Sequence, residues 1–488
     1  MDMAERGVTR HEMKNNHDNH SMSEEHRIMM LTRHHHQTQW VYWVIILLGF
    51  WMVLSPLTFD YGRGLIAPTG NRIPWLDITT RVTLLKWSDL ISGLLIIILG
   101  LRSLKPNRPV ELWTICFIGI WLSAAPLLFW APSSMIYLNE TFVGMMLIAL
   151  TILIPGMPNM IHYMEMGSEV PPGWSYNPSS WAQRSLLIAL GFAGLVVSRY
   201  LAAFQLGYID KVWDPFFGDS SRLVLHSNMS KSLFISDAGF GAFAYTFEFL
   251  MGWMGSPSRW RTMPWMVTLF GILVIPLGLV HIFLVISQPV VVGHWCTFCI
   301  VAALIMLPMI PLEVDEVIAM VQFMRKSKKE GQSLWKVFWK GGTLQGSKEK
   351  DERSPQLEKF YENPREVYQA SLWGMSFPLS LWITTSLGLW LMFTPFLIGN
   401  SQIAADVDHL AGALIVTFSV IAMGETMRTG RFLNALLGIV VIGSPFLFDH
   451  YTTLGAINDI IIGILIIIFT IPRGPIKENF DTWNKMIK

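Results

Sequence analysis

Two of the three cysteines in this chain lie three positions apart, in the motif Cys296-Thr-Phe-Cys299. Cysteines at this spacing fit one turn of a helix, so they can form a disulfide and exchange it with other thiols. A zinc site built only from cysteines of this chain is excluded because there is no second cysteine pair. The third cysteine, Cys116, lies in an apolar run, where a lone thiol serves packing. The motif predicts thiol–disulfide chemistry, and the alternative is a pair of small apolar core residues.

The rest of the chain has the composition of a membrane protein. Only 15% of its residues are charged and 52% are hydrophobic, whereas a soluble globular protein is about a quarter charged. Apolar runs long enough to cross a bilayer recur, and in lipid such runs must be helices because their backbone groups have to bond internally. We predict an all-α polytopic membrane protein with about twelve transmembrane helices. They begin near Trp40, Val82, Val110, Met135, Gln183, Ser236, Met263, Val292, Met375, Ile403, Phe432 and Leu454.

The distribution of lysine and arginine predicts the orientation of these helices. The loops on the side of the N-terminus carry Arg102, Lys105, Arg108, Arg259, Arg261, Arg428, Arg431 and a basic stretch after Pro311. The opposite loops carry only Arg63, Arg72, Arg81, Lys211, Arg222 and Lys231. The positive-inside rule then predicts a bacterial inner-membrane protein with both termini in the cytoplasm. The cysteine motif falls at the periplasmic end of the eighth span, where the compartment is oxidising and the helix N-terminus favours a thiolate.

The segment around the motif, from about Gln183 to Pro311, resembles the vitamin K epoxide reductase family. Members of that family are similar four-helix bundles that hold a quinone near the outer surface, with a Cys-x-x-Cys motif at the start of the fourth helix. Three further stretches carry the resemblance. They are the outer-loop sequence Trp213-Asp214-Pro215-Phe216-Phe217-Gly218, the following Ser220-Ser221-Arg222, and the second-helix residues Asp237, Phe240-Gly241 and Tyr245.

The resemblance implies roles for these residues. Cys296 and Cys299 would be catalytic, with Cys299 facing the quinone and Cys296 exchanging disulfides outward. Ubiquinone or menaquinone would be the cofactor, bound by Asp237, Phe240 and Tyr245. Read without the resemblance, Asp237 is an N-cap of the helix that follows Ser236, which is the commoner role of an aspartate there.

Two departures from the family concern the electron relay and the quinone site. The outer loop of the family carries two shuttle cysteines, and the matching positions here hold Trp213 and Ser220. A tyrosine that often lies four positions after the second motif cysteine is replaced by Ala303. The internal relay is therefore absent. Cys296 must meet an external thiol protein, a small-molecule disulfide, or nothing.

Four segments on both sides of this centre repeat one pattern. Each runs from a glycine to a proline: Gly49–Pro56, Gly119–Pro126, Gly388–Pro395 and Gly438–Pro445. Each following helix has an acid four positions before a glycine: Asp89/Gly93, Glu140/Gly144, Asp408/Gly412 and Asp459/Gly463. The pattern resembles the SPW repeat family, which has no established chemistry. We expect the glycines to allow close helix contact and the acids to cap or join helices.

Polar stretches divide the chain into seven parts. These are a His/Met-rich cytoplasmic tail (1–39), two SPW-like repeats (40–155), a cytoplasmic connector (156–181), the four-helix domain (182–312), a basic amphipathic segment (313–374), two further SPW-like repeats (375–475) and a cytoplasmic tail (476–488). The first tail is predicted to be disordered. Its histidines match no defined metal site, so we assign no metal ligand. The basic segment is typical of contact with membrane lipid.

The function predicted first is that of a thiol:quinone oxidoreductase, which exchanges electrons between periplasmic dithiols and membrane quinone. The expected partners are lipid, quinone and a periplasmic thiol–disulfide protein, and no nucleic acid. A second hypothesis is a membrane protein that handles copper or mercury through the cysteines and the His/Met-rich tail. Topology argues against that cooperation because the two lie on opposite sides. A third is a non-catalytic scaffold that has kept only the fold.

Overall fold

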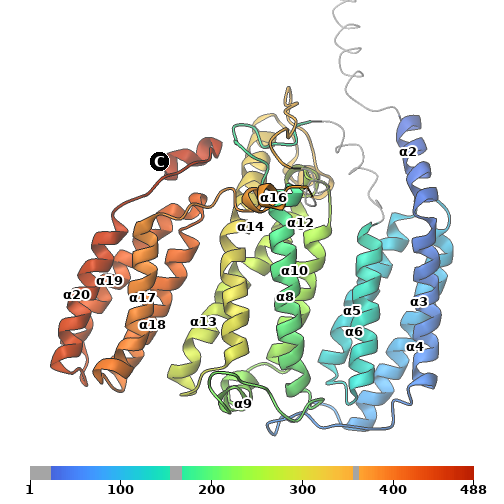
Figure 1. Cartoon of the computed structure of the whole chain (residues 1–488). Coiled ribbons are helices and arrows are strands. Elements are labelled where there is room, and N and C mark those ends of the chain that lie inside the picture. The colour runs from blue at the N-terminus through green and yellow to red at the C-terminus, as the bar shows by residue number, and fades with distance from the viewer. Residues whose placement is uncertain (1–23, 154–166, 356–361, 488) are drawn as a thin grey trace, which may run out of the picture.

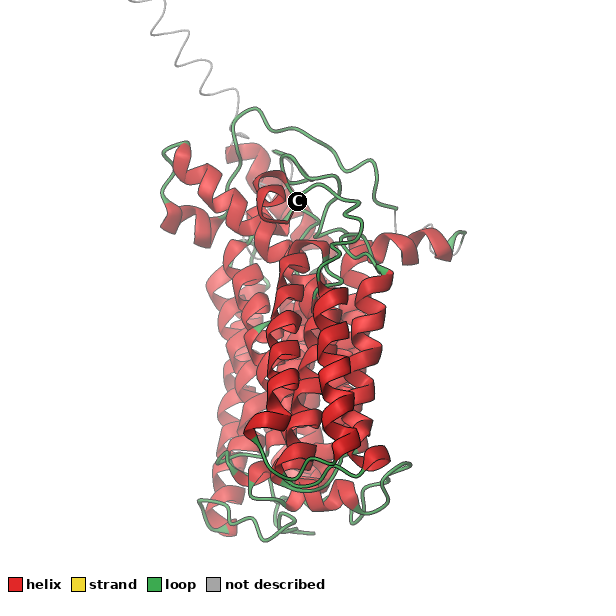
Figure 2. Cartoon of the chain, turned by 90° about the vertical axis from the view of Figure 1, so that its left-hand side faces the viewer, coloured by secondary structure: helices red, strands yellow, loops and turns green. Residues whose placement is uncertain are grey.

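The computed structural model describes residues 24–153, 167–355 and 362–487. Helices make up nearly all the regular structure of this part of the chain, and no strand occurs in it. Figure 1 shows three groups of long helices side by side, with the middle of the sequence between the two ends. Figure 2 shows the same helices running in one common direction, with short helices and loops at both ends. The predicted all-α membrane fold is confirmed.

The two outer groups, here called the flanking units, each consist of two helical hairpins. The N-terminal unit contains α3 (Gln39–Thr58), α4 (Ile78–Ser103), α5 (Pro109–Leu128) and α6 (Ser134–Leu153), and the C-terminal unit contains α17 (Leu379–Ile398), α18 (Ile403–Ile421), α19 (Phe432–Leu447) and α20 (Thr453–Thr470). Within each hairpin the backbones touch at paired glycines. A Cβ added to Gly412 would lie 2.5 Å from the carbonyl oxygen of Gly388, and one added to Gly93 would lie 2.8 Å from that of Gly49. Only glycine permits this approach, as the repeat predicted.

The middle group, here called the central unit, is built from four apolar segments. They are α8 (Trp181–Gln205), α10 (Asp237–Trp253), the broken helix α12 (Pro264–Val274) and α13 (Pro276–Val291), and α14 (Thr297–Lys329). The break falls at Pro276, which has no N–H to donate to the preceding turn. Eleven helical stretches in the described residues are long and apolar enough to cross a membrane. The twelfth predicted span, α10, has 17 residues and is slightly shorter than these.

The fourth segment of the central unit differs from its predicted bounds at both ends. It begins at Thr297 rather than near Val292, because Gly293 takes a left-handed backbone conformation (φ +76°) that separates it from α13. It continues through residue 312 to Lys329 as one helix of 33 residues. The beginning of the predicted basic segment is therefore a continuation of α14, which is mostly buried from Glu313 to Phe323. Glu313 and Glu316 in that continuation are fully enclosed.

Shorter elements close the two ends of the bundle. One end carries α2 (Glu24–Gln37), α11 (Arg259–Thr262), α15 (Leu334–Lys340), α16 (Pro364–Ser371), the 3-10 helices Glu425–Arg431 and Asp481–Trp483, and α21 (Asn484–Ile487). The other end carries α9 (Ser220–His226) and the 3-10 helix Met229–Lys231. Figure 1 shows α9 at the end of the bundle opposite α2 and the C-terminus. We call these two ends of the bundle the α9 end and the α2 end.

The expectation of a disordered N-terminal tail is wrong for residues 24–37. These residues form the helix α2, where His35 is buried and contacts the hydroxyl of Tyr42 and the carbonyl of Leu104. The earlier histidines, His11, His17 and His20, lie outside the described residues.

The four repeat acids do not cap helices, because each lies at least one turn inside its helix. Asp77 and Thr452 provide the caps of α4 and α20 instead. The acids face each other across hairpins, Asp89 with Glu140 and Asp408 with Asp459. The expectation that they join helices fits this arrangement, and the capping role does not.

Candidate active site

The two motif cysteines lie where α14 begins, at the α9 end. Cys296 is the N-cap residue, and its Sγ accepts a hydrogen bond from the N–H of Cys299 at 3.2 Å. The two residues form a disulfide, with their Cα atoms 5.2 Å apart. A free N-terminal turn presents unpaired N–H groups that stabilise negative charge on sulfur once the bond is reduced. The predicted position of the motif, in the first turn of a helix, is confirmed.

The two sulfur atoms differ in their surroundings. Cys296 is 0% exposed and packs with Val224 and Leu225 of α9 and with Val285 of α13. Cys299 is 8% exposed and contributes to the wall of a cavity. The resemblance implies that Cys296 exchanges disulfides outward, and an external thiol cannot reach a sulfur that is 0% exposed. Such exchange requires residues packed with Cys296, from α8, α9 or α13, to move.

Hydrogen bonds to Asp214 link the loop before α9 to the start of α14. Its Oδ1 accepts hydrogen bonds from the N–H of Phe217 at 2.8 Å and from the hydroxyl of Thr297. Its Oδ2 accepts one from the hydroxyl of Ser221, which itself accepts from the N–H of Thr297. Partial burial alone would raise the pKa of Asp214, but the hydrogen bonds from Ser221, Thr297 and the loop N–H groups lower the pKa to about 2. An ionised Asp214 therefore holds α9 over Cys296.

A cavity of about 350 Å³ extends from the disulfide between α8, α10, α13 and α14. Cys299, Asp237, Phe240 and Tyr245 all line it. These are four of the five site residues predicted from the sequence. The fifth, Cys296, does not line the cavity. Most of the remaining lining residues are apolar, among them Leu201, Val224, Leu225, Leu273, Leu277, Val280, Leu284, Val285 and Met306.

Asp237 belongs to a polar cluster at the mouth of this cavity. It accepts hydrogen bonds from the amide of Gln205 at 2.5 Å and from the hydroxyl of Ser230 at 3.0 Å. Arg72, from the loop between α3 and α4, donates to the same Ser230 hydroxyl at 2.8 Å. The N-cap of α10 is Ser236, whose hydroxyl accepts from the N–H of Gly239. Asp237 is therefore free of the capping role and is held instead by a cluster that includes the N-terminal flanking unit.

Tyr245 shapes the wall of the cavity. Its hydroxyl donates to the carbonyl oxygen of Ala302 at 3.0 Å, and its side chain is 2% exposed. Its ring fills the space beside Gly194, where any Cβ would overlap it. Because its hydroxyl hydrogen is already used, Tyr245 links α10 to α14 and presents its ring to the cavity.

Three polar residues of the cavity were not predicted from the sequence as part of a site. Glu248 is 1% exposed and lies three turns from Asp237 along α10. His281 lines the cavity from α13, with its ring edge toward Tyr245. Gln288 lies on the same helix, and its Oε1 is buried without a hydrogen-bond partner among the described residues. An acid inside an apolar run is itself a signal of function in membrane helices, and Glu248 could have been found on that ground.

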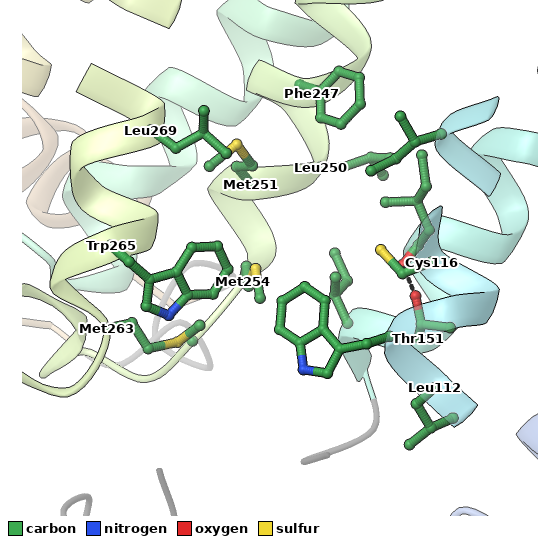
Figure 3. A pocket seen from close by; sticks show the side chains of 15 residues that line it. Leu112, Cys116, Thr151, Phe247, Leu250, Met251, Met254, Met263, Trp265 and Leu269 are labelled. Carbon is green, nitrogen blue, oxygen red and sulfur yellow. Dashed lines mark hydrogen bonds between the residues drawn. The ribbon is translucent and has the colours of Figure 1, made fainter. Parts of the chain in front are cut away.

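A second, smaller cavity of about 110 Å³ lies between the N-terminal flanking unit and the central unit. Figure 3 shows its apolar lining, including Phe247, Met251 and Trp265, and the hydrogen bond that the Thr151 hydroxyl donates to the carbonyl oxygen of Ile148. Cys116 is buried and unpaired. Burial in apolar surroundings disfavours the reactive thiolate form of a cysteine. Cys116 therefore contributes to packing, as predicted.

The three units coincide with two protein families. Residues 185–314 match the model of the Vitamin K epoxide reductase family, and residues 39–153 and 379–472 match the model of the SPW repeat domain. No curated protein and no solved structure is significantly similar to the chain. Of the helices that enclose the disulfide and the large cavity, α10, α12, α13 and α14 begin within the first of these matches, and α8 begins just before it. The chain thus carries a vitamin K epoxide reductase family domain between two SPW repeat domains.

Proposed function

We propose that this protein is a membrane thiol:quinone oxidoreductase, which exchanges electrons between dithiols at the α9 end and a quinone in the large cavity. One observation carries the proposal. Cys299, half of a disulfide at a helix start, lines the same cavity as Asp237, Phe240 and Tyr245. From the lysine and arginine distribution, we place the α9 end in the periplasm of a bacterial inner membrane and both termini in the cytoplasm.

The cavity suits a quinone in size and lining. Small-molecule sites in proteins span roughly 300–1,000 Å³ and are mostly apolar with a few placed polar groups. This cavity has about 350 Å³, an apolar wall, and the polar side chains of Asp237, His281 and Gln288. The unpartnered Oε1 of Gln288 is a buried polar atom that a ligand could satisfy. A bound quinone would supply an acceptor for two electrons and two protons.

In the proposed reaction, the two cysteines of the disulfide exchange electrons with different partners. Cys299 would exchange electrons with the cavity, and Cys296 would exchange disulfides with a periplasmic thiol protein. Cys296 is enclosed by α9, so this exchange proceeds only when the Asp214 contacts release α9. Trp213 and Ser220 replace the shuttle cysteines of the family, so the partner thiol must reach Cys296 itself.

Thiol trapping of Cys296 and Cys299 in cells, with and without quinone, tests the proposal. We expect the pair to be oxidised when quinone is present and to become reduced when it is depleted. Cys299→Ser should trap mixed disulfides between Cys296 and a partner, whereas Cys296→Ser should trap none. If both thiols stay reduced at every quinone level and neither variant captures a partner, the central unit is a non-catalytic scaffold.

A further inference from the structure

Glu248 occupies an unusual place in the central unit. It lies on α10 eleven residues from Asp237, which corresponds to roughly 16 Å along the helix. Glu248 and Cys299 line the same cavity. The disulfide lies in the part nearer the α9 end, and Glu248 lies in the part nearer the α2 end. Its Oε2 has no hydrogen-bond partner among the described residues. An ionised carboxylate with a buried oxygen that accepts no hydrogen bond is costly in such a place, which favours the protonated form of Glu248.

A second enclosed acid continues from Glu248 toward the α2 end. Glu313 is 0% exposed on α14, and neither of its carboxyl oxygens has a hydrogen-bond partner in the described part of the chain. Arg259 joins the two helices one turn beyond these acids, because it donates to the carbonyl of Met251 on α10 and to Glu316 on α14. Glu313 therefore lies near Glu248, and their charges interact. The guanidinium groups of Arg184 and Arg259 are also within electrostatic range and would stabilise negative charge on Glu313. This second acid can therefore give up a proton and take it back.

Beyond Glu313, hydrogen-bonding groups continue to the α2 end. Glu316, one turn along α14, forms a buried ion pair with Arg259 at 2.5 Å and accepts a hydrogen bond from the hydroxyl of Ser179. The N–H of Ser179 donates to Asn177, whose amide donates to the carbonyl of Pro257 at 3.0 Å. Pro257 is only half-buried in the loop before α11. Polar groups thus occur at intervals from Glu248 to the loop before α11, at the end of the bundle opposite the disulfide.

The other charged or titratable groups around Glu248 do not replace this route. Tyr245 on α10 donates its hydroxyl hydrogen to Ala302, and Arg184 from α8 binds the carbonyls of Gly252 and Gly255 at the end of α10. His281 from α13 lines the cavity and contacts the ring of Tyr245, and it is not among the groups that interact with Glu313. Glu248 is the one described carboxyl that both lines the cavity and interacts with Glu313.

We propose that Glu248 and Glu313 carry protons between the cavity and the α2 end, so that turnover moves charge across the membrane. The inference rests on the proposed thiol:quinone activity. In the direction of thiol oxidation, formation of one S–S bond releases two electrons and two protons at the α9 end. Reduction of one quinone to quinol consumes two electrons and two protons. If the consumed protons enter through Glu313 and Glu248, two protons disappear at the α2 end for each disulfide formed, and the reverse reaction reverses the flow.

The first test needs no quinone. The infrared spectrum of the purified protein should contain a carbonyl band from a protonated, buried carboxyl that Glu248→Gln removes and Glu248→Asp restores in shifted form. Glu140→Gln, a buried acid of the flanking unit, removes a different band and serves as the matched control. If the spectra of the wild type and Glu248→Gln do not differ in this region, Glu248 is ionised and the proposal fails.

The second test uses oriented proteoliposomes with dithiothreitol, a short-chain benzoquinone and pH dyes on both sides. We expect wild-type turnover to make the α2 side alkaline, and Glu248→Gln and Glu313→Gln to slow thiol oxidation by about 100-fold, the scale of a lost proton-transfer group. Glu140→Gln should match the wild type. Normal thiol oxidation with all protons exchanged at the α9 side would overturn this inference and leave the proposed function intact. Absence of any thiol oxidation would overturn both.

Discussion

Buried acidic side chains have different surroundings in the central unit and in the flanking units. In the flanking units the acids come in facing pairs, and Tyr61 and Asn400 donate hydrogen bonds to Asp89 and Asp408. The glycine contacts one turn away leave no space for a ligand. In the central unit, Glu248 lines a cavity, and neither oxygen of the nearby Glu313 carboxyl has a hydrogen-bond partner among the described residues. An acid in an apolar helix is therefore packed against a second helix in the flanking units, and in the central unit it has access to a cavity, as the proposed proton transfer requires.

The largest expected effect concerns the buried ion pair of the central unit. Arg259→Leu leaves Glu316 enclosed without its cation, and breaking a buried pair in this way costs about 3–5 kcal/mol of unfolding free energy. The double variant Arg259→Leu/Glu316→Leu should recover much of that loss. Arg222→Ala, which removes an exposed pair with Asp219, should leave stability unchanged. Unfolding in mixed detergent measures all three, and a tolerated Arg259→Leu would mean that the charge is not enclosed.

The second-largest expected effect distinguishes glycines at contacts between two helices from glycines elsewhere in a helix. Gly412→Ala places a Cβ against the backbone of Gly388 and should destabilise the protein by about 1–3 kcal/mol, as overpacking does. Gly443→Ala is the matched control, because a Cβ there meets only the end of Leu447 at 3.9 Å. It should be neutral or stabilising, since alanine favours helix over glycine by about 1 kcal/mol. Equal effects of the two variants would refute the close backbone packing.

A smaller effect is expected when one acid of a flanking pair is replaced by its amide. Asp459→Asn keeps a polar group that can donate to Asp408, so stability should change by no more than about 1 kcal/mol. Thiol oxidation should keep the wild-type rate, because the pair lies outside the large cavity. The free energy of unfolding and the rate of dithiothreitol oxidation are the two measurements. A loss of turnover in a stable variant would show that the flanking acids take part in chemistry.

These contrasts also explain what the sequence could predict. The cysteine motif and the repeat glycines depend on spacings within one helix turn or one hairpin, so their positions followed from the sequence. The positions of Asp237, Phe240 and Tyr245 followed from a resemblance that covers the whole bundle.

Other features depend on contacts between distant segments. The burial of Cys296 results from the way α9 folds back, and Arg72 reaches the cavity mouth from another unit. No local pattern encodes either contact. Glu248 was missed for a different reason, since averaging hydropathy over a whole span hides a single acid.

The smallest expected effect concerns the loop that covers Cys296. The N–H groups of Phe216, Phe217 and Ser221 donate to Asp214, whose pKa is lowered to about 2 in the folded protein from a usual value near 4. A lowered folded-state pKa gives stability that is complete above about pH 4 and is lost as the pH falls through about 2.

Hydrogen–deuterium exchange of these three amides, compared between wild type and Asp214→Asn at each pH, measures this contribution. Wild-type amides should be better protected above pH 4, and the two proteins should converge near pH 2. Asp210→Asn, at an exposed aspartate of the same loop, should follow the wild type at every pH. Loss of the Asp214 contacts should also speed alkylation of Cys296 after reduction, because the same contacts hold α9 over its sulfur. Protection that is independent of both pH and Asp214 would mean that apolar packing alone closes the site.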